Sequence, residues 1–350
     1  MRWCCVLWQW TGAVIVMVTQ VAFSTAFDTH DTPDHPENAD RTAVMLDELS
    51  MSPLSSAVTM VAPEILPERL LYEVHSAEMI ERVKEASLEG CWIDLDTYVS
   101  KNDYETARLA AGAVLQLSEA VVAGRISNGY ALVRPPGHHA SAERSMGFCL
   151  FNNAALAAHE LSKQGRRVLI FDHDVHHGNG TQEIFYGRRD VMYMSFHLSP
   201  HYPGTGLVPE IGEGAGLGYT VNAPLGFGMG DEVVRRLFDE VFIPVARQFK
   251  PDVVLVSAGY DSHHLDPLGG LRLTADFFGE MVQRLQEVQP RVVVTLEGGY
   301  NLSWIGRCFL SQLGVLVSQP QHFEDAAVGS GDIRPMVKEM KKVLSAYWRF

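Results

Sequence analysis

Four short, continuous apolar runs with helix-forming segments between them constrain the fold of this chain more than any other feature. The runs are Val168–Phe171, Val191–Met194, Val253–Val256 and Val292–Thr295. Runs without polar alternation are typical of strands that are buried on both faces of a parallel sheet. Parallel strands require crossover connections, and helices are expected at 104–123, 153–163, 231–249, 274–288 and 333–350. The sequence therefore predicts one α/β domain with a central, mostly parallel β-sheet and helices on both faces.

Composition agrees with a globular domain and argues against nucleic acid as a partner. Of 350 residues, 47% are apolar and 20% are charged, which is an ordinary globular balance. The formal net charge is −14, from 28 basic and 42 acidic residues, whereas phosphate binding requires a basic surface. The five cysteines are scattered without a CxxC pair, so neither a disulfide framework nor a Cys-rich zinc site is expected. A reducing compartment, such as the cytoplasm, fits this usage best.

The amino terminus allows three interpretations. A mostly apolar stretch runs from Trp3 to Phe23, and a signal peptide would look similar. Polar residues interrupt the stretch, so a membrane-spanning helix is the weaker interpretation. We favour a third, in which Val18–Phe23 is the first strand of the sheet. Residues 1–18 are then assigned to an extension without a role in the fold, and residues 19–350 to the domain.

Polar motifs follow three of the four apolar runs. Asp172-His-Asp174 comes after the first, Ser257–Asp261 after the third, and Glu297–Tyr300 after the fourth. In open α/β sheets the ligand crevice lies beyond the carboxyl ends of the strands. We therefore expect three strands to deliver reactive side chains to one place.

The spacing of Asp174 and His176 indicates a metal site. On an extended segment, residues i and i+2 point to the same side, so both side chains can reach one ion. Asp261, at the end of a neighbouring strand, is the natural third ligand. One imidazole and two carboxylates suit zinc with an open coordination position, while iron or manganese stays open because carboxylates suit harder ions. The alternative is that such strand-end acids only cap helices.

An adjacent histidine pair strengthens the metal-site interpretation. His138 and His139 follow a Pro-Pro-Gly turn, and burying two imidazoles requires two hydrogen-bonding partners. Asp172 can hold one ring and Asn179 the other. Together with Tyr300, the pair makes a metal site a better explanation of the Asp-x-His spacing than that spacing does alone.

Six ordered motifs of this chain resemble the histone deacetylase family, in particular its class II branch and bacterial relatives. The first of them is Arg-Pro-Pro-Gly-His-His-Ala. The motifs are Arg134–Ala140, Gly147–Asn153, Asp172–Gln182, Tyr202–Gly206, Asp266–Gly270 and Leu296–Asn301. The resemblance runs from about Val21 to the last helix, which is nearly the whole chain. It implies an arginase-like fold and a zinc-dependent deacetylase, with zinc held by the Asp-His-Asp set.

The resemblance also implies a role for each polar side chain around the metal. His139 would act as general base and then as acid to the leaving amine, next to Asn179, which replaces the Asp of class I members. His138, oriented by Asp172, would assist electrostatically. Tyr300 would donate a hydrogen bond to the oxyanion. Because some class II members that carry His at this position are weak deacetylases, Tyr300 predicts a competent enzyme.

Further residues are implied at the substrate and at a second ion. Phe148 and Tyr202 would form the walls of a narrow tunnel. A potassium ion would bind beside the zinc, and Arg41 would line an inner channel for acetate, unless it forms an exposed salt bridge. The residues expected at the substrate are Gly147, Phe148, Tyr202, Leu268 and either Asn102 or Asp103. The potassium site would involve Asp172, Ser195 and Phe196, together with two zinc ligands.

The substrate is inferred from the residue that follows an Asp-Pro pair. Polyamine-selective relatives carry Glu at this position, whereas Asp266-Pro267 is followed here by Leu268. We therefore expect acetyl-lysine in a peptide or protein. The alternatives are an acetylpolyamine-type amidohydrolase, a catalytically weak acyl-lysine reader or scaffold, and an arginase-like enzyme with two manganese ions, which would need more acidic ligands.

Other histidines are expected to be structural or to lie at the rim, namely His177, His263 and His264, while His173 stands where class II members often have Trp or Leu.

Overall fold

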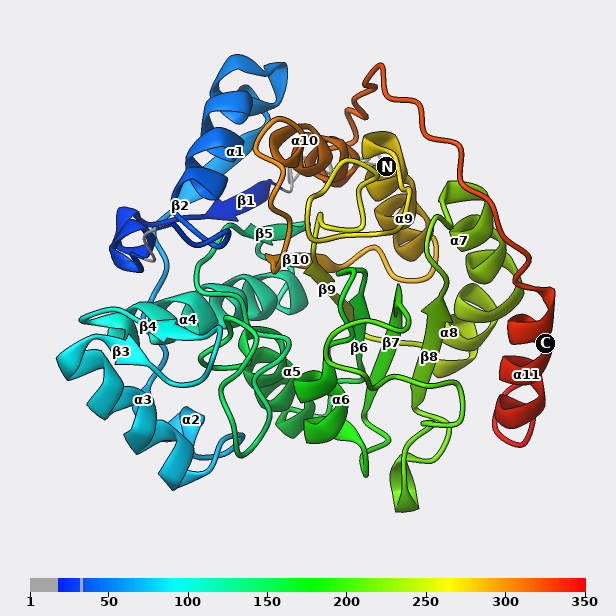
Figure 1. Cartoon of the computed structure of the whole chain (residues 1–350), viewed down its shortest axis with the longest axis horizontal. Helices are drawn as coiled ribbons and strands as arrows, with labels where there is room; N and C mark the ends of the chain where they lie inside the picture. Colours follow the sequence, from blue (N-terminus) through cyan, green and yellow to red (C-terminus); the bar gives the residue numbers. More distant parts are fainter. Residues whose placement is uncertain (1–17, 32–33) are drawn as a thin grey trace, which may run out of the picture.

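A computed structural model describes residues 18–31 and 34–350. Within these residues eight strands form one central sheet, in the order β2-β1-β5-β10-β9-β6-β7-β8, and every pairing is parallel (Figure 1). The strands are β1 (Thr19–Ala22), β2 (Val58–Val61), β5 (Gly129–Ala131), β6 (Val168–Asp172), β7 (Val191–Leu198), β8 (Thr220–Leu225), β9 (Val253–Ala258) and β10 (Val292–Leu296). A small antiparallel pair, β3 (Cys91–Trp92) and β4 (Tyr98–Val99), lies apart from it.

The predicted α/β architecture is confirmed, and the four apolar runs form β6, β7, β9 and β10. The predicted first strand, Val18–Phe23, is β1, one residue shorter at each end. Three strands were not predicted from the sequence, each for a local reason. β2 is a half-exposed edge strand, β5 has only three residues, and β8 contains Pro224. The proposed extension lies almost wholly outside the described residues.

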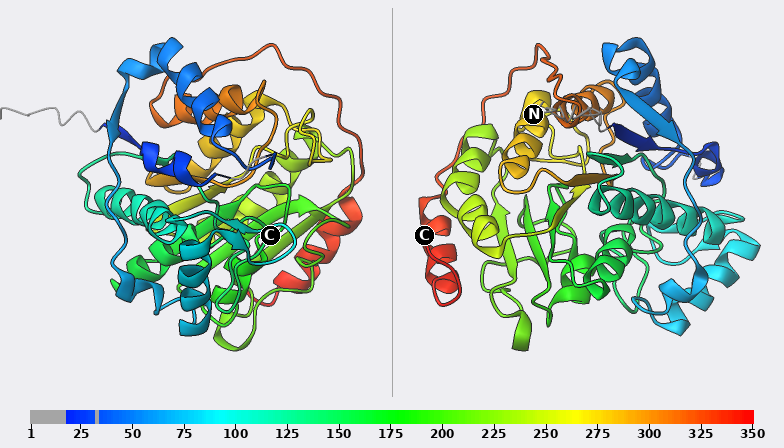
Figure 2. Two further views of the ribbon diagram at one scale, coloured as in Figure 1. Left: turned by 60° about the vertical axis from the view of Figure 1, so that its left-hand side comes forward. Right: turned by 180° about the vertical axis from the view of Figure 1, so that it is seen from behind.

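Helices cover both faces of the sheet, which can be followed in Figures 1 and 2. On one face α4 and α5 pack against the sheet and α3 packs against α4, while the hydrophobic cluster on the other face includes α1, α7, α8, α9, α10 and α11. The helices are α1 (Asp40–Met51), α2 (Glu68–Leu71), α3 (Ala77–Glu89), α4 (Asp103–Val122), α5 (Asn153–Lys163), α6 (Asn179–Phe185), α7 (Asp231–Leu237), α8 (Ile243–Phe249), α9 (Ala275–Gln286), α10 (Ile305–Leu316) and α11 (Arg334–Leu344). The helix expected at 231–249 is interrupted by a π-helical turn at Phe238–Phe242. In the described part of the chain, no helix combines the length and apolar character that crossing a bilayer requires.

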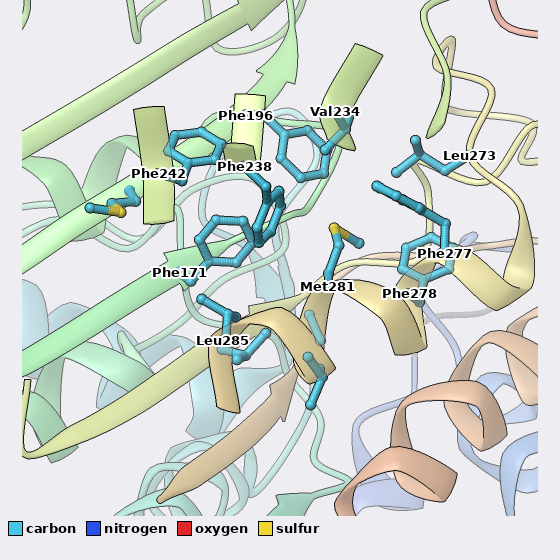
Figure 3. Packing of buried hydrophobic residues seen from close by; sticks show 14 of the residues in the cluster. Phe171, Phe196, Val234, Phe238, Phe242, Leu273, Phe277, Phe278, Met281 and Leu285 are labelled. Atoms are coloured by element: carbon cyan, nitrogen blue, oxygen red, sulfur yellow. The ribbon is translucent and has the colours of Figure 1, made fainter. Parts of the chain in front are cut away.

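Strand β6 shows why continuous apolar runs form this sheet. Val168 and Ile170 face one hydrophobic cluster, whereas Phe171 faces the other. The Phe171 ring lies 5.2 Å from that of Phe238 and 5.6 Å from that of Phe242, both in the π-helical turn (Figure 3). Because both faces of the strand are covered, it tolerates polar residues only where it ends.

The carboxyl ends of the strands meet at one edge of the sheet. Asp172, the last residue of β6, lies opposite Ser195 of β7 on one side and Ser257 of β9 on the other. Leu296 of β10 lies opposite Ala258 of β9. The loops that follow β6, β9 and β10 therefore start side by side, as the positions of the polar motifs predicted.

Candidate metal centre and active site

The structure brings the three predicted metal ligands together. One ligand atom from each of Asp174, His176 and Asp261 lies within 4.8 Å of the others. The Nδ1 atom of His176 is 2.9 Å from Asp174 Oδ1 and 3.2 Å from Asp261 Oδ2. Both carboxylates are fully buried, and the imidazole is the most accessible of the three side chains. The two loops after β6 and β9 thus place a mixed N/O donor set around one point.

The remaining bonds of the two carboxylates fit a bound cation. Asp174 Oδ2 accepts a hydrogen bond from the N–H of Gly298 (2.8 Å), and Asp261 Oδ1 accepts one from the N–H of Val175 (2.8 Å). Asp261 Oδ2 is buried, and apart from its 3.2 Å contact with His176 Nδ1 it has no hydrogen-bond partner among the described residues. Burial and the charge of Asp174 raise the pKa of Asp261 to about 7. A divalent ion at this point would supply the positive charge that keeps both carboxylates ionised.

Two glycines leave the space around these carboxylates open. A Cβ atom at Gly259 would lie 2.0 Å from Asp174 Oδ2, and one at Gly298 would lie 2.2 Å from Asp261 Oδ2. Real side chains never approach so closely, so both positions require glycine if the two acids are to keep their present place. The glycines of the strand-end motifs are therefore part of the metal site.

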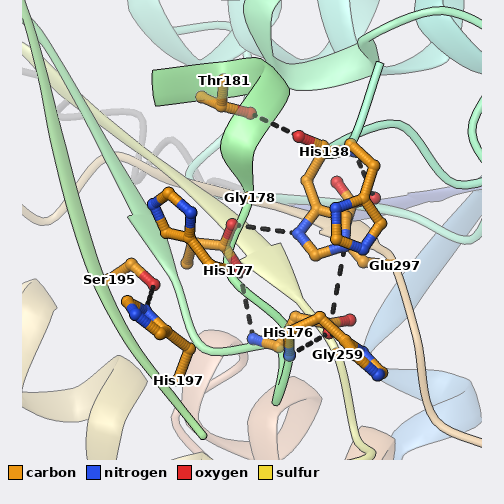
Figure 4. Close-up of polar contacts among 12 residues, drawn as sticks. His138, His176, His177, Gly178, Thr181, Ser195, His197, Gly259 and Glu297 are labelled. Carbon is orange, nitrogen blue, oxygen red and sulfur yellow. Dashed lines mark hydrogen bonds and ion pairs between the residues drawn. The ribbon is translucent and has the colours of Figure 1, made fainter. Parts of the chain in front are cut away.

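The histidine pair lies next to this cluster, with the two ring centroids 4.0 Å apart. His138 Nδ1 is 3.1 Å from Asp172 Oδ2, and His139 Nδ1 is 2.8 Å from Asn179 Oδ1, as the sequence predicted for the two partners (Figure 4 shows His138). His139 in turn lies 5.9 Å from the His176 ring, measured between centroids. In each imidazole Nδ1 therefore bonds to a side-chain oxygen, and Nε2 takes no part in that bond.

The electrostatic environment separates the two histidines. Burial lowers the pKa of His138, but Asp174 and Asp172 outweigh it and raise this pKa to about 10. Burial, together with the positive charges of His138 and His176, lowers the pKa of His139 well below its ordinary value. Neighbouring groups whose pKa values are driven apart are the arrangement that acid–base catalysis uses.

A narrow cavity of about 230 Å³ opens onto the cluster. It contains the predicted Phe148, Tyr202, Leu268 and Tyr300. The cavity is lined by Asp96, Pro136, His138, His139, Gly147, Phe148, His176, His201, Tyr202, Leu268, Gly298 and Tyr300. At Gly147 the backbone has φ +56°, and a Cβ atom would lie 2.5 Å from His139 Cδ2, so only glycine allows the wall to approach that ring.

The structure corrects one of the two residues predicted at the cavity mouth, Asp103. The carboxylate of Asp103 is buried, lies 2.6 Å from His30 Nδ1 and accepts the N–H of Ser100, also at 2.6 Å. Asp103 is therefore not available to a substrate, whereas Asn102 is exposed and its contact with the substrate backbone stays a prediction. Asp96, in the turn between β3 and β4, lines the cavity instead. The sequence does indicate an acidic residue before the long helix, but the one that lines the cavity is Asp96, seven residues before the predicted Asp103.

Sequence reasoning also missed His201, which precedes the predicted wall residue Tyr202. Its ring stacks on that of His176 at 4.9 Å, and its Nε2 lies 3.2 Å from the carbonyl oxygen of Leu268. Its position directly before Tyr202, the first residue of a family motif, is the sequence feature that could have identified it. His201 thus packs against the candidate metal ligand from the cavity side.

Arg41 is fully buried, so the exposed salt bridge considered for it is wrong. Its guanidinium donates to the carbonyl oxygens of Gly299 (2.7 Å) and Glu297 (2.5 Å) and to the carboxylate of Glu37 (2.9 Å). The ring of Tyr300 lies 5.1 Å from the guanidinium carbon. Arg41 therefore holds the backbone of the loop that carries Tyr300.

His173 has a structural explanation. Its Nδ1–H donates to the carbonyl oxygen of Gly259 (2.9 Å), and its Nε2 accepts from the amide of Gln312 (2.8 Å). Burial lowers its pKa to about 4, so the ring is neutral and satisfied. The other histidines that were expected to be structural also have protein partners: His177 contacts Thr205 and Gln182, and His263 and His264 contact Asp325.

The residues predicted for a potassium ion lie side by side on the neighbouring strands β6 and β7. Asp172 and Ser195 are paired in register on β6 and β7, and Phe196 follows. Ser195 Oγ is 3.0 Å from His197 Nδ1 (Figure 4). The structure thus places these groups next to one another, and potassium binding stays a prediction.

Comparison with known proteins identifies the family. The model of the histone deacetylase domain matches residues 35–316. A probable deacetylase of Archaeoglobus fulgidus is 36% identical over 360 residues, which cover 95% of this chain and 99% of that protein. Histone deacetylase HDA1 of Saccharomyces cerevisiae is 38% identical, over 79% of this chain but only 42% of the yeast protein.

Solved structures agree with this assignment. The crystal structure of the HDA15 HD domain superimposes with a TM-score of 0.89 at 35% identity, covering 95% of both chains. The predicted arginase-like fold is therefore confirmed, and metal binding is general in this group of proteins. This chain belongs to the histone deacetylase family.

Proposed function

We propose that this protein is a zinc-dependent hydrolase that removes acetyl groups from lysine side chains of peptides or proteins, and that residues 19–350 form its catalytic domain. Its family supports an enzyme that hydrolyses acetyl amides. The observation that carries the proposal is the convergence of the Asp-His-Asp cluster, the histidine pair and Tyr300 on one narrow cavity. A catalytically weak reader would not need this complete set.

The metal would be held by Asp174, His176 and Asp261. When bound there, zinc polarises the acetyl carbonyl and lowers the pKa of a water molecule. The two carboxylates offer fewer acidic ligands than a two-manganese centre requires, which favours one ion. A potassium ion beside Asp172, Ser195 and Phe196 would add positive charge behind the site.

His139 is the residue that moves the proton. Because its Nδ1–H donates to Asn179 Oδ1, the Nε2 lone pair remains available on the cavity side. The lowered pKa of His139 keeps the ring neutral at pH 7, so it can take a proton from the attacking water. The resulting imidazolium then gives this proton to the leaving amine.

His138 and Tyr300 stabilise the charge that develops during the attack. Despite its burial, the pKa of His138 is raised by Asp174 and Asp172. The ring therefore stays protonated and acts as a fixed positive charge. Burial and the neighbouring Asp261 raise the pKa of Tyr300 well above its ordinary value, so its hydroxyl keeps the proton. This hydroxyl donates a hydrogen bond to the carbonyl oxygen as that oxygen becomes negative.

The cavity favours a linear side chain with an amide at its end. Its walls include Phe148, whose ring centroid is 6.1 Å from that of Tyr300, and Tyr202, 5.1 Å from the His139 ring. Leu268 offers no charged partner to a polyamine. We infer that Asp96, at the cavity, accepts the hydrogen bond from the substrate backbone that sequence reasoning assigned to Asn102 or Asp103.

Asp96 also supports the second candidate function, a small-molecule amidohydrolase. Its carboxylate at the cavity can pair with the ammonium group of an acetylated polyamine. The two functions are separated by comparing kcat/KM for acetyl-lysine peptides with kcat/KM for acetylated spermidine and putrescine. Faster turnover of the polyamines would overturn the lysine assignment.

The metal assignment is tested by Asp261→Ala, which removes one carboxylate ligand. We expect the purified variant to lose both bound zinc, measured by elemental analysis, and hydrolysis of the peptide. Zinc retained with full turnover would place the centre elsewhere.

A further inference from the structure

Glu297 connects the loop that carries Tyr300 to the loop that carries the histidine pair. It follows β10, and its side chain is fully buried. One carboxylate oxygen, Oε2, accepts hydrogen bonds from the N–H groups of Gly137 (2.7 Å) and His138 (3.1 Å). Figure 4 shows Glu297 beside His138. A single acceptor atom therefore holds the backbone at the start of the pair.

Other groups hold the carbonyl oxygens of the histidine loop: Thr181 donates its N–H to His138 (3.2 Å), and the amide of Asn153 donates to Pro135 (3.1 Å). Pro135 and Pro136, which precede the N–H groups of Gly137 and His138, have no N–H donors of their own. A Cβ atom at Gly137 would lie 2.5 Å from the backbone nitrogen of Asn153, so the turn is packed tightly against the start of α5. Buried N–H groups require acceptors, and the Glu297 carboxylate supplies the one for both.

The other end of this connection is equally well fixed. The carbonyl oxygen of Glu297 accepts from Arg41 Nη2 (2.5 Å), and its N–H donates to the carbonyl oxygen of Ala258 (2.9 Å). The next residue, Gly298, donates its N–H to Asp174 Oδ2 (2.8 Å). A movement of Glu297 would therefore displace the Tyr300 loop as well.

We propose that Glu297 is a positioning residue that sets the placement of His138 and His139 relative to Tyr300. This inference rests on the proposed function for the catalytic roles of those three side chains. The second oxygen of Glu297, Oε1, makes no hydrogen bond with any described residue. One acceptor oxygen at the right reach accounts for the contacts, so the reach of the side chain matters more than its charge.

Two variants separate reach from charge. Glu297→Gln keeps an acceptor oxygen at the same reach and removes the charge, whereas Glu297→Asp keeps the charge and is one methylene shorter. For Glu297→Asp we expect kcat for an acetyl-lysine peptide to fall about 10- to 100-fold, with KM within about twofold and the metal retained, because small misplacements of catalytic groups are costly. For Glu297→Gln we expect kcat within about threefold of the parent protein.

Hydrogen–deuterium exchange of a peptide spanning 134–140 measures the connection without relying on activity. We expect faster exchange in Glu297→Asp and near-parent exchange in Glu297→Gln. An impaired Glu297→Gln with an unimpaired Glu297→Asp would show that charge matters and would overturn the proposal, as would parent-like exchange and kcat in both.

The two proposals fail in different ways. If the parent protein hydrolyses no acetylated substrate, the proposed function fails, while the exchange measurement still decides whether Glu297 holds the loop. If Glu297→Asp does not fold, a folded Glu297→Gln that loses more than about tenfold in kcat, or that exchanges faster at 134–140, overturns the positioning role.

Discussion

Replacing Asn179 by Asp should move the pH dependence of this enzyme in a direction that identifies its general base. Asn179 Oδ1 is 2.8 Å from His139 Nδ1 and is a neutral acceptor. Burial and the positive charge of His138 hold the pKa of His139 well below its ordinary value. A carboxylate at position 179 would oppose these effects, because it stabilises the protonated ring.

The size of the effect follows from this contact. At about 3 Å and an effective dielectric constant of about 20, two unit charges attract by about 5 kcal/mol, which sets an upper limit of roughly four pKa units. The new carboxylate must itself be partly desolvated and lies near other acids, so we expect the pKa of His139 to rise by roughly one to three units. A base acts only when neutral, and kcat/KM falls as pH decreases through its pKa. The acidic limb of the profile should therefore move to higher pH by the same amount.

The assay is the pH profile of kcat/KM for an acetyl-lysine peptide between about pH 5 and 9, with metal content checked at each pH. Asn179→Ala is the matched control, since it removes the hydrogen bond without adding charge, and its acidic limb should not move upward. A metal-loaded Asn179→Asp whose acidic limb stays in place or moves to lower pH would refute His139 as the base.

Two further variants test the oxyanion donor and the support behind it. Tyr300→Phe should retain zinc but lose roughly 10²–10³ in kcat, because one preorganised donor to the oxyanion is lost, and wild-type turnover would remove Tyr300 from the mechanism. Arg41→Met should lower the free energy of unfolding by about 2–5 kcal/mol in urea titrations, because the carbonyl oxygens of Gly299 and Glu297 lose their donor, at about 1–3 kcal/mol each, while Glu37 keeps its bonds to Arg134. A loss below about 1 kcal/mol would show that Arg41 is not a structural support.

Much of the fold was predictable because parallel strands leave a strong signal. Because they are covered on both faces, β6, β7, β9 and β10 begin with continuous apolar runs. Polar residues appear only in the second half of each strand, toward the carboxyl edge of the sheet. This is why the sequence alone predicts that Asp172, Asp174 and Asp261 lie at one place, as the structure has them. Short or edge strands such as β2 and β5 carry no such contrast, and they were missed.

The cavity mouth could not be predicted with the same accuracy, because it is built by loops. Asp103 and Asp96 are both acidic and lie seven positions apart in the same segment. Only the tertiary structure shows that Asp103 bonds to His30 beneath the surface, whereas Asp96 lies on the turn that borders the cavity. The path of the chain between β3 and β4 decides which acid is exposed, and local residue types do not determine that path.

The buried acids at the sheet edge link metal binding to the protonation states of the two histidines. Asp172, Asp174, Asp261 and Glu297 are all fully buried, and such a concentration of negative charge is stable only if nearby groups compensate it. Backbone N–H groups and His138 provide part of this compensation, and a cation held by Asp174 and Asp261 would provide the rest. The same charges that would bind the metal keep His138 protonated, and its positive charge keeps the adjacent imidazole neutral. Metal binding and the base strength of His139 are therefore coupled through Asp174, which is both a candidate metal ligand and a cause of the raised pKa of His138, so a variant that alters Asp174 should alter both.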